Sequence, residues 1–87
     1  MSKKVVLVGC GNMGYAMLKG WMAAGKLEPS AVSVVEPNAE LRARAEKLGV
    51  NAHSSAETLD DTAPDLVIFA IKPQVIRDVV PAYRRFA

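Results

Sequence analysis

The feature that most restricts how this chain can fold is a set of three glycines placed directly after an apolar run. Residues 4–8 are mainly Val and Leu and show no alternation of polar and apolar side chains, which is typical of a strand covered on both faces. Gly9, Gly11 and Gly14 then give the pattern G-x-G-x-x-G, and a helical pattern begins at Asn12. In this strand-to-helix context the pattern predicts a binding site for a phosphate-containing ligand.

Each glycine of the pattern has its own expected task. Gly9 permits a tight turn, Gly11 lets the backbone approach a pyrophosphate without a Cβ in the way, and Gly14 allows the helix to pack closely against the sheet. Free main-chain N–H groups then face an anion at the positive end of the helix. These groups are expected from Cys10, Gly11, Asn12 and Met13. The alternative is a glycine-rich turn that binds nothing.

The rest of the chain alternates between short Val-rich runs and helical patterns. Strands are expected at residues 4–8, 31–35, 50–52 and 66–71, and helices at 12–24, 39–48, from 54 onward and at 74–80. Such alternation predicts a parallel sheet with right-handed crossovers. We therefore expect an α/β fold with strand order 3-2-1-4, the first half of a doubly wound sheet. Residues 1–87 would then form one partial domain, because the pattern of a second half does not follow.

The helix boundaries and the buried side of the first helix can also be predicted. Asn38 is a favourable N-cap, and Ser54 with Glu57 has the spacing of a capping box. Apolar or small residues recur at intervals of three and four along residues 12–24, so they are expected to form the buried stripe. These residues are Met13, Ala16, Met17, Gly20, Trp21 and Ala24.

An acidic residue ends the second expected strand. Glu36 lies 22 residues beyond Gly14, a separation at which a carboxylate commonly binds the ribose hydroxyls of adenosine and repels a 2′-phosphate, which favours NAD. Asn38, Arg42 and Arg44 lie just downstream, and either arginine could instead reach a phosphate. The alternatives are an ordinary exposed strand end for Glu36 and a solvated helix face for the arginines.

A second group of candidate residues follows the fourth expected strand, whose carboxyl end should lie beside the glycine turn. Ligands of open α/β sheets bind outside these strand ends. The candidates are Ala70, Ile71, Lys72 and Pro73. Lys72 would place a cation beside the ligand and Pro73 would stiffen the turn, although a plain turn with a solvated lysine is the alternative.

Composition excludes several classes of protein. The net charge is +2, whereas binding to nucleic acid or to an anionic membrane requires a concentrated basic face. Cys10 is the single cysteine and His53 the single histidine, so neither an internal disulfide nor a metal-ligand set is expected. We interpret Cys10 as a small loop residue and His53 as a structural side chain. The apolar runs are too short for a membrane span, and a mature cytoplasmic start is expected.

Two runs of this sequence resemble one enzyme family. Residues 8–14, with Gly20 and Trp21 after them, resemble the amino-terminal signature of pyrroline-5-carboxylate reductase. Residues 70–74, Ala-Ile-Lys-Pro-Gln after an apolar strand, resemble its second signature. The resemblance implies a Rossmann-like fold and an oxidoreductase that reduces 1-pyrroline-5-carboxylate to proline with NADPH or NADH, the last step of proline biosynthesis.

The resemblance also implies which residues contact the cofactor, and two positions of this sequence differ from the family pattern. It implies that residues 9–14 hold the pyrophosphate and that residues 70–73 line the nicotinamide side. Ser55 stands where the family commonly has a cofactor-contacting asparagine, and Glu36 stands where phosphate-binding polar residues are usual. The family's helical dimerisation and substrate domain does not follow, so we expect a truncated domain that binds NADP or NAD weakly without turnover.

Truncation has a further expected consequence. The strand at residues 66–71 would be an exposed apolar edge, and such edges pair with other chains. We therefore predict self-association into a homo-oligomer, by edge pairing or by exchange of the last helix. Two rival functions stay open: the cofactor domain of another imine or β-hydroxyacid reductase, and a non-enzymatic minimal fragment of the fold.

Overall fold

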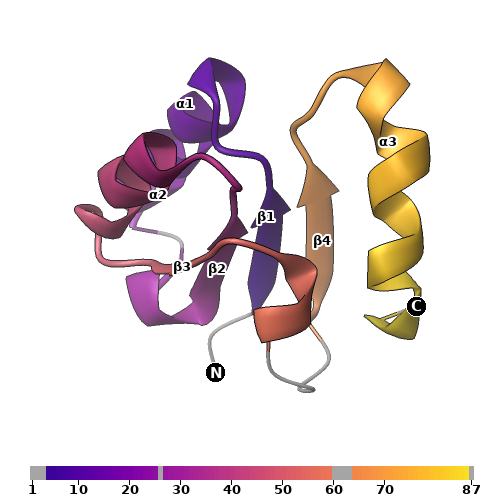
Figure 1. Ribbon diagram of the computed structural model, residues 1–87. Coiled ribbons are helices and arrows are strands. Elements are labelled where there is room, and N and C mark those ends of the chain that lie inside the picture. Colours follow the sequence, from indigo (N-terminus) through magenta and orange to yellow (C-terminus); the bar gives the residue numbers. More distant parts are fainter. Residues whose placement is uncertain (1–3, 26, 60–63, 87) are drawn as a thin grey trace.

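Four parallel strands form the centre of the computed structural model, which describes residues 4–25, 27–59 and 64–86. The strands are β1 (Val5–Val8), β2 (Val32–Val35), β3 (Asn51–His53) and β4 (Leu66–Phe69). Their order across the sheet is β3-β2-β1-β4, so β1 and β2 are central and β4 lies at one side (Figure 1). The predicted Rossmann-like α/β fold and its strand order are confirmed.

Helical segments connect the strands on both faces of the sheet (Figure 1). The α-helices are α1 (Asn12–Ala24), α2 (Ala39–Glu46) and α3 (Pro73–Val79), and the 3-10 segments are η1 (Pro29–Ala31), η2 (Ala56–Thr58) and η3 (Val80–Phe86). The longest, α1, has 13 residues, and no helix among the described residues is long and apolar enough to cross a membrane.

The core consists of two apolar clusters on opposite faces of the sheet. The first joins β1 and β2 to α1 and α2 through Leu7, Cys10, Leu18, Val32, Val34, Ala45, Val50 and Ala70. The second lies under η2 and η3 and contains Val6, Val8, Val35, Ala56, Leu59 and Tyr83. Because alternate residues of β1 enter alternate clusters, this strand is buried on both faces, which explains its unbroken run of Val and Leu.

The prediction for the buried stripe of α1 was wrong: the buried side of the helix is shifted by about one residue position from the predicted one. Gly14 and Leu18 are its buried residues, and Trp21 packs against the same cluster one turn later. Met13, expected to be buried, is 59% exposed. The rotation follows from Gly14, which must face Gly9 for the helix to approach the sheet closely, and this contact turns Met13 outward.

The two predicted caps had different outcomes. The Asn38 side chain accepts hydrogen bonds from the N–H groups of Glu40 and Leu41, at 2.9 and 3.1 Å, and so begins α2 as predicted. Ser54 caps no helix; η2 follows Ser55, which makes no side-chain cap hydrogen bond. The segment forms only one 3-10 turn, which is too short for the reciprocal bonds of a capping box.

Candidate functional site

The turn between β1 and α1 is closed by Gly9, which lies in the left-handed region with φ +93°. Its N–H donates to the carbonyl of Val35 at 2.8 Å, which ties the turn to the end of β2. A Cβ at Gly9 would lie 2.5 Å from Cγ2 of Ile71 and 2.8 Å from the carbonyl oxygen of Ala70. The ends of β1, β2 and β4 therefore converge on this glycine, and no other residue fits there.

Gly11 differs from Gly9 because nothing in the described chain crowds it. Its φ is −70°, which any residue can adopt, and no described residue beyond its neighbours along the chain has a heavy atom within 4 Å of an ideal Cβ. It is the N-cap of α1 and has no side-chain cap. Within the described residues, the N–H groups of Gly11, Asn12 and Met13 have no hydrogen-bond partner. These three amides at the positive end of α1 are therefore available to an anion.

The amide of Cys10 is not available, contrary to the prediction. It donates to Oε1 of Glu36 at 2.8 Å, and Oε2 of the same carboxylate accepts the N–H of Asn38 at 3.0 Å. Glu36 is only 8% exposed, so it is not an ordinary exposed strand end. The carboxylate is fixed between the glycine turn and the beginning of α2.

Both downstream arginines bind the protein backbone and do not form a solvated face. Arg42 donates through Nη1 to the carbonyls of Glu36 and Pro37, at 2.9 and 2.8 Å. Arg44 donates through Nη2 to the carbonyl of Cys10 at 3.2 Å. Its guanidinium carbon lies 3.9 Å from the centroid of the Tyr15 ring, within the range of a cation–π contact.

The thiol of Cys10 is completely buried in the first apolar cluster. Burial raises its pKa, the nearby Arg44 acts in the opposite direction, and Glu36 adds to the increase. A thiol with a raised pKa stays protonated at neutral pH and is a poor nucleophile. The structure therefore favours a packing role for Cys10 over a reactive one.

The carboxyl end of β4 lies directly against the glycine turn. The N–H of Ala70 donates to the carbonyl of Val8 at 2.8 Å, and its Cβ lies 3.4 Å from an ideal Cβ on Gly14. Lys72 is exposed and precedes α3, whose first residue is Pro73. The structure brings Ala70 and Ile71 to the candidate site, whereas no hydrogen bond between described residues joins Lys72 or Pro73 to it.

The remaining candidates lie along the same edge of the sheet. The Glu36 N–H donates to the carbonyl of His53 at 2.9 Å, and Ser55 follows His53 by two residues, with no hydrogen bond to the glycine turn among the described residues. His53 Nδ1 lies 2.8 Å from Oγ1 of Thr58, in agreement with a structural role.

Tyr15 could not be recognised from the sequence, because its contact with Arg44 joins two helices and leaves no local pattern. Among the described residues, no group of three or more His, Cys, Asp or Glu side chains could hold a metal.

Comparison with known proteins gives a consistent result. A family model described as "NADP oxidoreductase coenzyme F420-dependent" matches residues 4–86. Pyrroline-5-carboxylate reductase of Escherichia coli is 36% identical over 81 residues, covering 92% of this chain and 30% of that protein. The enzyme of Arabidopsis thaliana is 36% identical over 80 residues, covering 91% of this chain and 29% of that protein.

Other relatives and a solved structure complete the comparison. Acetaldehyde dehydrogenase of Mycolicibacterium paratuberculosis is 36% identical over 83 residues, 92% of this chain and 27% of that protein. A pyrroline-5-carboxylate reductase structure from Coxiella burnetii has a TM-score of 0.83 at 24% identity, covering 95% of this chain and 30% of that one, which supports the fold. The chain thus spans about 30% of the length of these pyrroline-5-carboxylate reductases. With nearly its whole length matched by the family model, the chain belongs to the F420-dependent NADP oxidoreductase family, and its resemblance to pyrroline-5-carboxylate reductase is confirmed.

Proposed function

We propose that this chain is the dinucleotide-binding part of a pyrroline-5-carboxylate reductase, the oxidoreductase that makes proline in the last step of its biosynthesis. One observation carries the proposal. The amides of Gly11, Asn12 and Met13 are unpartnered within the described chain, at a position that a Cβ would not crowd, where the strand ends converge. Such an arrangement binds a diphosphate through main-chain hydrogen bonds and the dipole of α1. The names of several relatives indicate the substrate.

Different residues of the site would bind different parts of the cofactor. The three free amides would hold the diphosphate, and the fixed carboxylate of Glu36 would accept hydrogen bonds from the adenosine ribose. Ala70 and Ile71 lie at the end of β4, on the side where a nicotinamide would be placed. Lys72, Pro73, Asn38 and Ser55 complete the proposed cofactor surface. When bound, the reduced nicotinamide supplies the hydride; the protein's contribution is to bind and orient it.

We also propose that these residues bind the cofactor without turning over substrate. Reduction of an imine requires a second reactant held against the nicotinamide in the correct geometry. The chain spans about 30% of the length of the pyrroline-5-carboxylate reductases that it matches, so we infer that the second reactant is held largely by the part of those enzymes that this sequence does not match.

Calorimetric titration of the purified chain with NADH and with NADPH tests the proposal. We expect saturable heat with at least one of them and no formation of proline when the imine is added. Absence of heat at millimolar ligand would contradict cofactor binding. Measurable proline formation would contradict the division between cofactor and substrate sites.

Glu36 is expected to bias binding toward NADH, although the family description names NADP. Its buried carboxylate is anchored by two amides and cannot turn away from a 2′-phosphate. Glu36→Gln removes the negative charge, so the ratio of the two dissociation constants should shift by about tenfold toward NADPH. Fluorescence titration of both cofactors measures the ratio. Glu40→Gln, which removes an exposed charge from the first turn of α2, should leave it unchanged; an equal shift in both variants would contradict the assignment.

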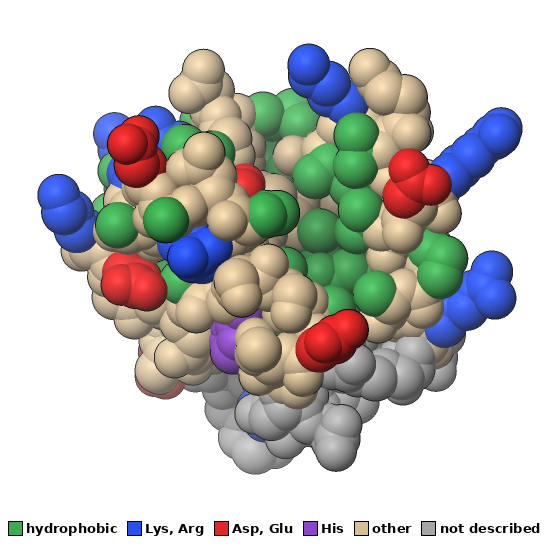
Figure 2. Space-filling view, viewed as in Figure 1, with side chains coloured by type: hydrophobic (Ala, Val, Ile, Leu, Met, Phe, Trp, Pro, Cys, Tyr) green, Lys and Arg blue, Asp and Glu red, His purple; other side chains and the backbone are tan. Residues whose placement is uncertain are grey.

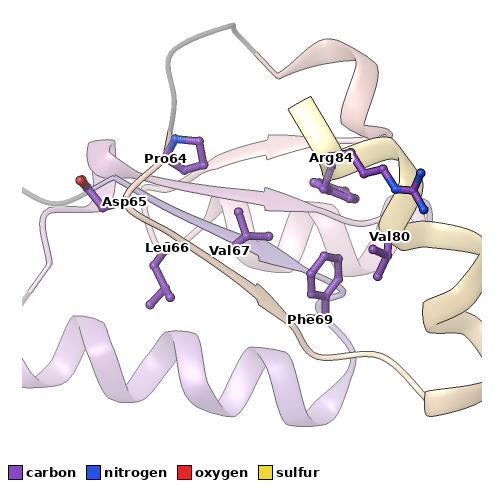
Figure 3. Close-up of a pocket in the computed structure, with 8 residues that line it drawn as sticks. Pro64, Asp65, Leu66, Val67, Phe69, Val80 and Arg84 are labelled. Carbon is purple, nitrogen blue, oxygen red and sulfur yellow. The ribbon is translucent and has the colours of Figure 1, made fainter. Parts of the chain in front are cut away.

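A final part of the proposal concerns the edge of the sheet. Within the described residues β4 pairs only with β1, and Leu66 is 50% exposed. A groove of about 350 Å³ runs beside it, lined in part by Val67, Phe69 and Val80 (Figure 3). Figure 2 shows hydrophobic side chains gathered in this part of the surface, next to α3. We propose that a second copy covers this edge, because two copies of one open strand pair through the same residues about a two-fold axis.

Leu66→Lys should shift the chain toward the monomer, because a lysine on an open edge discourages pairing and this exposed position tolerates the charge. Light scattering at millimolar protein concentration measures the change. Val75→Lys is the matched control, since Val75 is 40% exposed on α3. A wild-type chain that stays monomeric at this concentration would contradict self-association, and an equal effect of both substitutions would contradict the role of β4.

A further inference from the structure

Glu36 and Arg44, both far from the glycine turn in the sequence, bind two consecutive peptide groups of that turn. Glu36 accepts the N–H of Cys10, and Arg44 donates to the carbonyl of Cys10 at 3.2 Å. The Arg44 guanidinium is held in place by Tyr15, whose ring centroid lies 3.9 Å away. Its Nε atom is buried without a partner among the described residues, an unfavourable arrangement that the contacts of the guanidinium with Cys10 and Tyr15 must offset.

The hydrogen bond from Arg44 determines the direction of the neighbouring amide. In a trans peptide the carbonyl of one residue and the N–H of the next point in opposite directions, and the described chain has no cis peptide. Because the Cys10 carbonyl points toward Arg44, the Gly11 N–H must point away from it. That is the amide which has no partner in the described chain and no crowding around an ideal Cβ.

We propose that Arg44 is a positioning residue for cofactor binding: it does not touch the cofactor, but it orients the Gly11 amide toward the diphosphate. The inference rests on the proposed function. The sequence suggested two roles for Arg44, a solvated helix face or a direct phosphate ligand. We infer instead that Arg44 acts indirectly, through its hydrogen bond to the carbonyl of Cys10. Glu36 fixes the preceding peptide in the same way, so the turn is held from both sides of Cys10.

The test compares Arg44→Met, Arg44→Lys and Arg77→Met in titrations with ADP-ribose and with adenosine, followed by the amide NMR signals of the labelled chain. Met keeps the contact with Tyr15 but cannot donate, and Lys keeps the charge without the fork of donors. Arg77, exposed on α3, controls for the loss of one positive charge.

We expect Arg44→Met to weaken ADP-ribose binding by about tenfold, which corresponds to about 1.4 kcal/mol. Adenosine lacks the diphosphate, so its affinity should not change. The Gly11 signal should move in the ligand-free variant, and Arg44→Lys should recover less than half of the lost affinity on a logarithmic scale. Arg77→Met should bind as the wild type does.

The outcomes separate this inference from the function on which it rests. A wild-type chain that does not bind ADP-ribose contradicts the proposed function itself. Binding by the wild type together with equal binding by Arg44→Met overturns only the role of Arg44. Full recovery by Arg44→Lys would mean that charge acts at a distance, and equal losses for adenosine and ADP-ribose would mean that the substitution disturbs the whole domain; both results overturn positioning.

Discussion

Gly14→Ala is expected to lower the free energy of unfolding by about 3 kcal/mol, the upper part of the usual range for overpacking. A Cβ at this position would overlap the carbonyl oxygen of Gly9, which is backbone and cannot rotate away. It would also contact the Cβ of Ala70 at 3.4 Å, so α1 would have to move away from the sheet. Urea denaturation followed by circular dichroism measures the loss, which is large against a typical domain stability of about 5–15 kcal/mol.

Gly20→Ala is the matched control for this result. Gly20 lies in the same helix, and no described residue outside the adjoining helix backbone has a heavy atom within 4 Å of an ideal Cβ. Alanine is the better helix former, so this substitution should stabilise the chain by about 0.5–1 kcal/mol. If Gly14→Ala stays within about 0.5 kcal/mol of the wild type under the same conditions, α1 does not approach β1 as described.

Gly11→Ala is expected to weaken cofactor binding while the chain stays folded. Its φ of −70° suits alanine and the space around a Cβ is open in the described chain, so the fold should persist. The new methyl group would occupy the space that the diphosphate needs to reach the amides at the beginning of α1. We expect NADH affinity to fall by at least about tenfold, with the unfolding free energy lowered by only about 1 kcal/mol, the usual difference between glycine and alanine at an N-cap.

Calorimetry with NADH and urea denaturation of the same Gly11→Ala preparation check both halves of this expectation. The Gly20→Ala variant, which changes a glycine of α1 away from the turn, should bind as the wild type does. Unchanged NADH affinity in Gly11→Ala would place the diphosphate away from this glycine. A folding defect with parallel loss of affinity would mean that Gly11 serves the fold, as Gly14 does.

The elements that could be predicted from the sequence are those specified by neighbouring residues. The unbroken apolar run of β1, the glycine spacing behind it and the Asn38 cap each depend on residues a few positions apart, and each was confirmed. The alternation of strands and helices then restricted the topology to the observed order. Rotation of α1 about its axis was not predictable from apolar spacing, because the contact between Gly14 and Gly9 decided it.

The candidate site was predictable only in outline. The glycine turn and the residues after β4 were expected together, and Ala70 and Ile71 do contact it. The occupation of the Cys10 amide could not be expected, because Glu36 is 26 positions away and its side-chain direction depends on packing at the end of β2. The same holds for Arg44, which reaches Cys10 across 34 positions and requires the ring of Tyr15 beneath it.

The central claim is that the amides of Gly11, Asn12 and Met13 bind the diphosphate of a nicotinamide dinucleotide. A crystal structure of the chain grown with NADH tests it most directly. We expect diphosphate oxygens at about 3 Å from these amides, with the Cys10 amide still bound to Glu36. A diphosphate bound elsewhere on the chain, or a Gly11 amide turned inward to a protein acceptor, would contradict it.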